Sequence, residues 1–450
     1  MGDEILDIIP FKNRSKIGIE LPGSKSISNR ALILAVLNQG PVELRGILDS
    51  DDVNIMLAAL KDLGIKIREG KKNSIYIEGT GGKIPVKSAT LNVGNAGTVA
   101  RFLTSLLALQ DGSQYILDGT EAMRKRPMGG LIKSLEDHGT RFEYLGEKEH
   151  FPFKILCNGL NSSDWFIDAS ESSQILSAIL LIAPCIKGKK TIQLKGSTVS
   201  KPFVTMTLKM MEQFSRDSGY NVFSNLDNYS ITSFDYNIND EFYQIEPDAT
   251  AASYFLSLPI SVYGEIHIEN IQNCILQGDI NYCDIIAKCG VNLDHSKSGI
   301  TSHVSSSITG GDFDFNDISD TFLTLAALSP LLKTPLSIQG ISHTRKQETD
   351  RVSGMVNQLK KIVDHVEESH DSIRIVPDGD FFKKVINKPI EIETYEDHRF
   401  AMSFAILGSF DLLGNNQPWL RIIDPMCCTK TFPNFFKTLD FCRTKVENGQ

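Results

Sequence analysis

The feature that most constrains the fold of this chain is an apolar helix that recurs six times along its 450 residues. Each copy opens with small polar or charged residues and continues with an apolar run that is too long for one strand. Neighbouring copies are separated by roughly 70 to 80 residues, a spacing that is typical of a repeated structural unit. The copies begin at Ser28, Gly97, Ser172, Asp248, Ser319 and Asp397.

A second, amphipathic helix alternates with the first. Its apolar residues follow the i, i+3, i+4 spacing of a half-buried helix. Its copies begin at Asp51, Arg126, Ser200, Gly278, Glu348 and Lys430. Short β-rich runs such as SIYIEG, KTIQLKG and GEIHIEN lie between the helices.

These patterns predict an α/β fold of six strand–helix–strand–helix units, three in each of two similar domains, with the apolar helices buried inside. The alternative is an ordinary α/β sheet in which the spacing is a coincidence. By repeat count the midpoint lies between the third and fourth units, in the polar, irregular sequence from Ser215 to Glu246.

Charge and composition exclude several classes of protein. The formal charge of −9 and the pI near 5.6 argue against a nucleic-acid partner. The eight cysteines show no C-x-x-C pair and no metal spacing, and the start MGDEILDIIPF lacks a basic signal region, so we expect a cytoplasmic protein with reduced thiols. The longest apolar run, from Ile175 to Ile186, falls short of the roughly 20 residues that span a bilayer, so no membrane partner is expected.

Side chains suited to anions gather at the expected helix starts. Such a start presents unpaired backbone N–H groups and about half a positive charge, so it attracts anions. If the buried helices of both domains direct their starts at one interdomain cleft, we expect a cationic pocket with two or three carboxylates, suited to a phosphate ester or phosphocarboxylate. The side chains are Lys25, Ser26, Arg30, Asn95, Gly97, Thr98, Arg101, Arg126, Ser172, Ser173, Gln174, Ser200, Lys201, Asp320, Glu348, Arg351, His398, Arg399 and Lys430.

The first of these starts resembles a nucleotide P-loop without matching it. The stretch GIELPGSKSISNR, from Gly18 to Arg30, has the glycine spacing of G-x-x-x-x-G-K-[ST], but Lys25 stands one place late. Ser24 or Ser26 could simply cap a helix. Lys25 and Arg30 favour an anion site that needs neither nucleotide nor Mg²⁺.

The other starts also have simpler interpretations. The turn Gly94–Thr98 could be only a strand-to-helix connection, and Ser172–Gln174 alone is a weak capping signal. A lone Asp320 before an apolar run is typical of an N-cap. Asp397 and the two residues after it are a more specific signal of a functional site. A buried helix rarely opens with three charged or titratable residues unless they serve a function.

Taken together, these motifs resemble the family of 5-enolpyruvylshikimate-3-phosphate synthases, which are enolpyruvyl transferases. They occur in the family's order from near residue 20 to near residue 440, so the resemblance covers nearly the whole chain. The matching segments are LPGSKSISNRALILA, SDDVNIMLAALKDLG, GNAGTVARFL, RKRPMGGLI, SSQILSAILL, SKPFVTMTL, EPDATAASYFL, ETDRVSGM, TYEDHRFAM and TKTFPNFF.

The resemblance implies two domains of three βαβαββ-type units each, with one domain interrupted by the other. We expect residues 21–245 to form the domain that binds shikimate 3-phosphate, and residues 246–450 with 1–20 to form the domain that carries the base. The implied reaction transfers the enolpyruvyl group of phosphoenolpyruvate to the 5-hydroxyl of shikimate 3-phosphate and releases phosphate, in the shikimate pathway to chorismate and the aromatic amino acids. No cofactor or metal is implied, a monomer is expected, and the phosphonate glyphosate would act as a mimic of phosphoenolpyruvate.

The resemblance also implies residue roles. Asp320 would be the base towards the 5-hydroxyl, Glu348 the proton donor, and Lys25 would reach both substrates. Shikimate 3-phosphate would be bound by Lys25, Ser26, Arg30, Ser172, Ser173, Gln174, Ser200, Asp320, His343 and Gln347. Phosphoenolpyruvate would be bound by Lys25, Gly97, Arg126, Gln174, Arg351, Arg399 and Lys430.

This chain departs from the family pattern at four positions. Phe203 stands where a tyrosine is common, and Phe102 stands where many relatives have a proline. His343 takes the place of an asparagine. Gln347 takes the place of a lysine, although Lys346 precedes it. The last two leave open how the 4- and 5-hydroxyls are held.

Two other functions compete with this interpretation. A related enolpyruvyl transferase acts on UDP-N-acetylglucosamine, but its expected loop cysteine is missing from DGTEAMRKRPMGG. A non-catalytic anion-binding protein of the same fold is disfavoured because Lys25, Asp320, Glu348 and Lys430 are all present.

Overall fold

The chain forms two compact units. The computed structural model describes residues 4–12, 16–71, 73–161, 164–196, 200–215, 219–225, 227–238, 240–271, 274–377 and 388–447. Met1–Pro22 with Pro247–Gln450 form one unit, here the split unit, and Gly23–Glu246 form the other, here the continuous unit. The sequence placed these borders at residues 21 and 245–246, close to Gly23 and Glu246.

The continuous unit contains both helix types expected from the sequence. Its helices are α1 (Lys25–Leu37), α2 (Asp51–Asp62), α3 (Gly97–Ala108), α4 (Glu121–Arg124), α5 (Gly129–Glu136), α6 (Ser173–Ile182), the 3-10 turn η1 (Ala183–Cys185) and α7 (Lys201–Gln213). Its strands are β3 (Pro41–Arg45), β4 (Ile67–Glu69), β5 (Ser74–Glu78), β6 (Ser88–Asn92), β7 (Asp111–Asp118), β8 (Arg141–Tyr144), β9 (Phe153–Asn158), β10 (Trp165–Ile167), β11 (Lys189–Leu194), β12 (Val222–Asn225), β13 (Asn228–Thr232) and β14 (Tyr243–Gln244).

The split unit repeats this composition. Its helices and 3-10 turns are α8 (Ala249–Val262), η3 (Gly278–Asn281), α9 (Tyr282–Cys289), η4 (Asn316–Ile318), α10 (Phe322–Leu328), η5 (Ser329–Leu331), η6 (Ser342–Lys346), α11 (Arg351–Leu359), α13 (His398–Gly408), η7 (Pro425–Lys430) and α14 (Phe435–Glu447). Its strands are β1 (Ile5–Asp7), β2 (Lys16–Ile19), β15 (Glu265–Glu269), β16 (Asn292–His295), β17 (Gly299–His303), β18 (Asp312–Asp314), β19 (Leu336–Gln339), β20 (His365–Glu368), β21 (Ser372–Val376), β22 (Ile390–Ile392) and β23 (Leu420–Ile423).

The repeat predicted from the sequence is confirmed by the sheets. Among the described residues, five four-stranded sheets share one topology, in which an edge strand pairs in parallel with the second strand and the other two follow antiparallel. Their orders are β6-β7-β9-β8, β10-β11-β13-β12, β14-β3-β5-β4, β2-β15-β17-β16 and β18-β19-β21-β20. The three-stranded sheet β22-β23-β1 follows the same plan, with one strand fewer.

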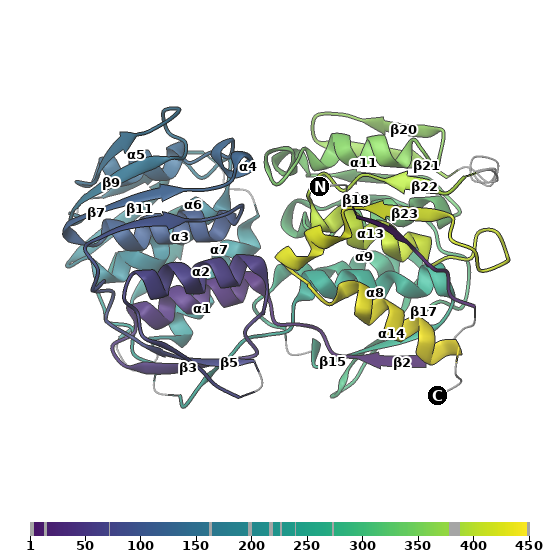
Figure 1. The fold of residues 1–450 in the computed structure, drawn as a ribbon, viewed down its shortest axis with the longest axis horizontal. Coiled ribbons are helices and arrows are strands. Elements are labelled where there is room, and N and C mark those ends of the chain that lie inside the picture. The colour runs from purple at the N-terminus through teal and green to yellow at the C-terminus, as the bar shows by residue number, and fades with distance from the viewer. Residues whose placement is uncertain are drawn as a thin grey trace. The chain divides into compact units, whose positions relative to one another are not determined.

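The apolar helices are buried, as predicted. A parallel strand pair requires a crossover, and α3, α6, α10 and α13 each supply one between the paired strands of their own sheet. Every residue of α3 from Gly97 to Ala108 is buried, and so is every residue of α13. In Figure 1, α1, α3 and α6 lie in the middle of the purple-to-teal unit with strands around them.

Two sheets obtain their first strand from a distant part of the chain. β2 precedes the continuous unit in sequence but pairs with β15, where Ile17 lies opposite Ile266. β14 ends the continuous unit but pairs with β3, which follows α1. At both points where the chain passes from one unit to the other, the last element of the first unit is therefore a strand, and the next element is a buried helix of the other unit.

Candidate active site

The starts of α10, α11 and α13 meet at a buried cluster of charges in the split unit. Asp320 lies two residues before α10, Arg351 is the first residue of α11, and Asp397 is the N-cap of α13. Asp397 accepts the backbone N–H of Arg399 at 3.0 Å, so its carboxylate caps the helix and also faces the cluster. Asp320 is not the N-cap of α10, because Thr321 occupies that position.

Arg351 is the centre of this cluster. Its side chain is 2% exposed, and it donates to three carboxylates. Nε lies 2.7 Å from Asp397 Oδ2, Nη1 lies 2.9 Å from Asp320 Oδ1, and Nη2 lies 2.9 Å from Glu348 Oε2. Nη1 also donates to the side-chain oxygen of Gln347. The guanidinium therefore joins the segments before α10, α11 and α13.

Two further cations complete the cluster. Arg399 Nη2 lies 2.7 Å from Asp320 Oδ2, and Nη1 lies 3.5 Å from the hydroxyl of the buried Tyr254. Lys430, at the end of η7, places Nζ 2.9 Å from Glu348 Oε1. Within the split unit the cluster thus contains the carboxylates of Asp320, Glu348 and Asp397 beside the cations of Arg351, Arg399 and Lys430. Among these six side chains the charges balance; the cationic pocket expected from the sequence also includes the cations of the continuous unit and stays a prediction.

The carboxylates keep both arginines charged despite their burial. Burial opposes the charged form of Arg351, but Asp397, Glu348 and Asp320 outweigh it and raise its pKa. Burial likewise opposes the charged form of Arg399, but Asp320, Tyr254, Asp397 and Glu348 together outweigh it and raise its pKa. Both side chains are therefore permanent cations that can exchange a carboxylate partner for a ligand anion.

The two departures at positions 343 and 347 lie beside the cluster. His343 Nε2 lies 2.8 Å from Ser319 Oγ, and burial lowers the pKa of His343 below its ordinary value, which favours a neutral imidazole at pH 7. Gln347 is half-buried and contacts Arg351, whereas the preceding Lys346 is exposed.

In the continuous unit, hydrogen bonds bring the starts of four helices to one end. Asn29 in α1 donates to Thr98 in α3 at 2.9 Å. Arg30 in α1 donates to Ser177 in α6 at 3.2 Å and to the carbonyl of Phe203 in α7 at 3.3 Å. All five residues lie within the first six positions of their helices, so the starts of α1, α3, α6 and α7 are near one another.

Arg30 is a buried cation bonded to neutral groups. It is 1% exposed, and Nε donates to Thr207 Oγ1 at 2.8 Å. Its guanidinium carbon lies 5.2 Å from the ring centre of Phe102 and 5.9 Å from that of Phe203. Burial lowers the pKa of Arg30 to about 9. An anionic ligand would compensate for this burial, which is consistent with the predicted role.

Lys25 and Gly97 occupy the first positions of α1 and α3. Lys25 Nζ lies 3.2 Å from Oδ2 of the buried Asp52, at the start of α2. Gly97 lies against Arg126, because a β-carbon at Gly97 would be 2.7 Å from Arg126 Nη2 and 3.0 Å from Arg101 Nη1. A methyl group at this start would therefore push the end of the Arg126 side chain aside.

The serines expected at helix starts are in those positions. Ser172 is the N-cap of α6 and accepts the backbone N–H of Gln174 at 3.3 Å, so it does cap its helix. Ser173 is the first residue of α6. Ser200, at the N-cap of α7, has a left-handed backbone with φ 52° and no side-chain capping bond. Ser26, in the first turn of α1, accepts Arg30 Nη1 through its carbonyl at 3.1 Å.

The predicted site residues therefore form two sets, one in each unit. Lys25, Ser26, Arg30, Gly97, Arg126, Ser172, Ser173, Gln174 and Ser200 belong to the continuous unit, and Asp320, His343, Gln347, Glu348, Arg351, Arg399 and Lys430 to the split unit. Sequence reasoning missed Asp52 and Tyr254 and did not assign Asp397 to the site. Asp52 and Asp397 stand at helix starts, a signal that could have found them. Tyr254 lies inside an apolar helix and gives no such signal.

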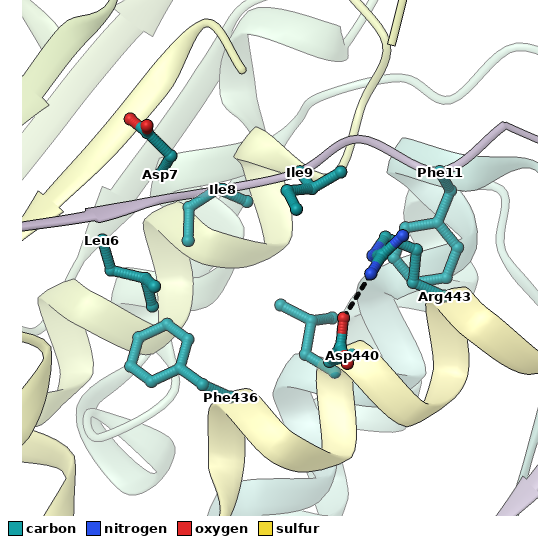
Figure 2. A pocket seen from close by; sticks show the side chains of 9 residues that line it. Leu6, Asp7, Ile8, Ile9, Phe11, Phe436, Asp440 and Arg443 are labelled. Carbon is teal, nitrogen blue, oxygen red and sulfur yellow. Dashed lines mark hydrogen bonds and ion pairs between the residues drawn. The ribbon is translucent and has the colours of Figure 1, made fainter. Parts of the chain in front are cut away.

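A separate pocket in the split unit differs in character. It has a volume of about 160 Å³ and lies between α14 and the segment from Leu6 to Phe11, as Figure 2 shows. Its lining is apolar except for Asp7, Asp440 and Arg443. Asp7 pairs with Arg421 at 2.6 Å, and Asp440 pairs with Arg443. It shares no lining residue with the cluster around Arg351, and its few charges are poorly suited to a phosphorylated acid.

The described residues contain no group of three or more histidine, cysteine or acidic side chains placed to hold a metal ion. Among them, no helix has the length and apolar composition needed to cross a membrane. All eight cysteines are free thiols.

Known proteins resemble this chain over nearly its whole length. It is 41% identical to the 3-phosphoshikimate 1-carboxyvinyltransferase of Opitutus terrae over 446 residues, which cover 98% of each chain. It is 38% identical to the enzyme of that name from a Shewanella species, with 93% of this chain and 95% of the relative covered. It is 36% identical to the enzyme of that name from Nostoc punctiforme, with 95% of this chain and 97% of the relative covered.

Solved structures share the fold at lower identity. The EPSP synthase of Acinetobacter baumannii has a TM-score of 0.76 and 23% identity, with 98% of both chains covered. The enolpyruvyl transferase NikO from Streptomyces tendae has a TM-score of 0.72 and 14% identity over the same share. The family model of EPSP synthase (3-phosphoshikimate 1-carboxyvinyltransferase) matches residues 12–439. The chain therefore belongs to the EPSP synthase family.

Proposed function

We propose that this protein transfers the enolpyruvyl group of phosphoenolpyruvate to the 5-hydroxyl of shikimate 3-phosphate and releases inorganic phosphate. The observation that carries the proposal is the cluster around Arg351, where the carboxylates of Asp320 and Glu348 each contact two cations. Family membership over residues 12–439 supports the same reaction.

The reaction needs a base and an acid. The 5-hydroxyl must lose a proton to attack C2 of phosphoenolpyruvate, and the methylene carbon must gain one. That carbon then loses a proton again as the C2–O bond to phosphate breaks, which restores the double bond and releases inorganic phosphate. Asp320 is the proposed base. Its two oxygens accept from Arg351 and Arg399, and a carboxylate oxygen can accept more than one hydrogen bond. Glu348 is the proposed proton donor, held between Arg351 and Lys430.

The carboxylate and phosphate of phosphoenolpyruvate would be bound by Arg351, Arg399 and Lys430, with Lys25, Gly97, Arg126 and Gln174 from the continuous unit. Since Arg351, Arg399 and Lys430 already pair with carboxylates, the substrate would replace those partners. A bidentate guanidinium suits both a carboxylate and a phosphate.

Shikimate 3-phosphate would be bound by Lys25, Ser26, Arg30, Ser172, Ser173, Gln174 and Ser200. The buried Arg30 supports this role, because its bonds go to hydroxyl and carbonyl groups. His343, Gln347 and Asp320 would contact the ring hydroxyls.

Phosphate release provides the test. With both substrates present, phosphate should appear together with a product that carries the enolpyruvyl group, and omission of either substrate should abolish it. Release with UDP-N-acetylglucosamine in place of shikimate 3-phosphate would assign the chain to the related transferase. Binding of both substrates without release would identify a non-catalytic protein. The monomeric state and the cytoplasmic location remain predictions, and light scattering after gel filtration tests the first.

A further inference from the structure

The segment just before α13 has an unusual backbone. Tyr395 and Glu396 both lie in the left-handed region, with φ of 55° and 57°. Residues other than glycine rarely adopt this conformation, and it persists where the surrounding structure holds it. The next residue is Asp397, whose carboxylate caps α13 and accepts from Arg351 Nε at 2.7 Å. The groups that hold Tyr395 and Glu396 therefore also decide where Asp397 lies.

Gln358 of α11 makes two contacts with this segment. It is 1% exposed. Its Oε1 accepts the backbone N–H of Glu393 at 3.1 Å, and its Nε2 donates to the hydroxyl of Tyr395. That hydroxyl also interacts with the side chain of Asn357. Both ends of the buried amide of Gln358 are thus satisfied by one short stretch of chain, residues 393–395.

Three residues on one face of α11 contact the segment. Arg351, Gly354 and Gln358 follow the i, i+3, i+7 spacing of a single helix face. A β-carbon at Gly354 would lie 2.8 Å from Phe400 Cζ and 3.2 Å from Tyr395 Cε2, so the two rings pack closely over this position. The rings of Tyr395 and Phe400 meet edge to face, with centres 5.3 Å apart. The same face of α11 therefore contacts the left-handed segment and the first turn of α13.

We propose that Gln358 is a positioning residue for phosphoenolpyruvate binding. The inference rests on the proposed function, in which Arg351 and Arg399 bind the anionic groups of that substrate. By holding the segment at Tyr395, Gln358 keeps the carboxylate of Asp397 against Arg351. Arg399 follows Asp397 by two residues, so its position depends on the same turn. Gln358 acts through this segment and not on the substrate itself.

The experiment measures kcat and both KM values for full-length variants. Gln358→Leu has a similar size but makes neither hydrogen bond. KM for phosphoenolpyruvate should rise by roughly 5- to 100-fold, the effect of losing two hydrogen bonds that position binding groups, and KM for shikimate 3-phosphate should rise by less. Gln358→Glu should restore the parental values, because its carboxylate can accept from both the N–H of Glu393 and the hydroxyl of Tyr395.

Lys361→Met is the matched control. Lys361 follows α11, and its Nζ donates to the carbonyl of Glu391 at 2.9 Å. The variant thus removes a neighbouring hydrogen bond to the chain just before the segment, without touching the left-handed pair. Both KM values should stay parental. A rise in KM for phosphoenolpyruvate as large as that of Gln358→Leu would overturn the specific role of Gln358.

The alternatives give different results. A purely structural role predicts a smaller folded fraction, so kcat would fall while both KM values stayed parental, and that result would overturn the inference. Equal rises in both KM values would overturn it as well. If Gln358→Leu does not fold, Tyr395→Phe, which removes only the hydroxyl, decides the question: a selective rise in KM for phosphoenolpyruvate supports the inference and parental values overturn it.

The parent enzyme separates this inference from the proposed function. A parent that releases no phosphate overturns both together, whereas an active parent with unchanged Gln358 variants overturns the inference alone.

Discussion

At the scale of single residues, Asp320 gives the most direct test of the chemistry. Asp320→Asn should lower kcat by ~10²- to 10⁴-fold, because an amide keeps the shape but cannot accept the hydroxyl proton. Binding of shikimate 3-phosphate should change only modestly. Steady-state rates and equilibrium binding check the two parts. Asp317→Asn, an exposed change in η4, is the matched control.

Near-normal kcat in folded Asp320→Asn would remove Asp320 as the base. A capping role would have predicted a loss of ~1 kcal/mol of stability at most, since asparagine caps well. The contacts of Asp320 with Arg351 and Arg399 favour the catalytic interpretation over a cap.

Gln347 tests how the ring hydroxyls are held. Its side-chain oxygen accepts from Arg351, so its amide nitrogen is the group that can donate to a hydroxyl. Gln347→Ala should raise KM for shikimate 3-phosphate by the ~0.5–1.5 kcal/mol of an ordinary hydrogen bond, with less effect on phosphoenolpyruvate. Lys346→Ala should do less. The reverse order would mean that Lys346 contacts the substrate.

Asp279, buried in η3, predicts how stability depends on pH. Its pKa is raised to about 7 in the folded protein, above the ~4 of an unfolded aspartate, so its contribution is complete below pH 4 and is lost as the pH rises through 7. Asp279→Asn should therefore raise the free energy of unfolding, by more at pH 8 than at pH 5. Urea unfolding at both values measures the difference. An equal effect at both would contradict the raised pKa.

Residue identities were predictable where the side chain stands at a helix start. Lys25, Arg30, Arg351 and Arg399 were singled out from that position alone. Their ion-pair partners were not, because the pairing of Arg351 with Asp397 joins two segments 46 residues apart and depends on tertiary packing. Asp279 gave no signal, since its raised pKa comes first from burial.

At the scale of helices and strands, Gly97 tests the start of α3. Gly97→Ala would place a methyl group 2.7 Å from Arg126 Nη2 and displace that side chain. Because the atoms met are the ends of flexible arginine side chains, the fold should tolerate the change, but a displaced Arg126 would no longer be placed for the ligand. KM for phosphoenolpyruvate should therefore rise, and glyphosate should bind more weakly still. Gly40→Ala, which would meet no atom within 4 Å, is the control. Equal KM values for all three proteins would contradict the placement of the ligand beside Gly97.

The type of each element was predictable because apolar residues repeat with different periods in helices and in strands. All six apolar runs and all six amphipathic runs form helices, since each buries the face that its spacing defines. The first residue and the N-cap of each helix were less predictable. α10 begins at Phe322 after the 3-10 turn η4, and the cap falls on Thr321, because local backbone geometry decides the first turn.

At the scale of the whole molecule, the split unit should fold without the continuous one. The N–H of Asp248 donates to the carbonyl of Pro22 at 2.9 Å, so a short linker can join residues 1–22 to 247–450. This joined chain should unfold cooperatively in urea. Residues 247–450 alone should not, because they lack Ile8, Phe11, Ile17 and Ile19, each no more than 6% exposed.

The difference in stability between the joined chain and residues 247–450 depends on the four buried side chains that the shorter chain lacks. Burying each is worth ~1.5–3 kcal/mol, so together they contribute at most on the order of 6–12 kcal/mol, which is comparable to the whole stability of a domain. If both chains unfolded with the same midpoint, β1 and β2 would be dispensable. The pairing of β2 with β15 lay beyond the reach of the sequence patterns, because alternation identifies a strand but not its partner.

The distant pairing of β2 also sets an order of events at the ribosome. Lys16–Ile19 emerge early, but their partner Glu265–Glu269 is synthesised about 250 residues later, a delay of roughly 10 to 50 seconds at ordinary translation rates. By contrast, β14 closes the sheet of β3 as soon as Gln244 has emerged. The middle of the chain is therefore complete before its beginning can find a partner, and an unpaired N-terminal strand must be kept from aggregation throughout that interval.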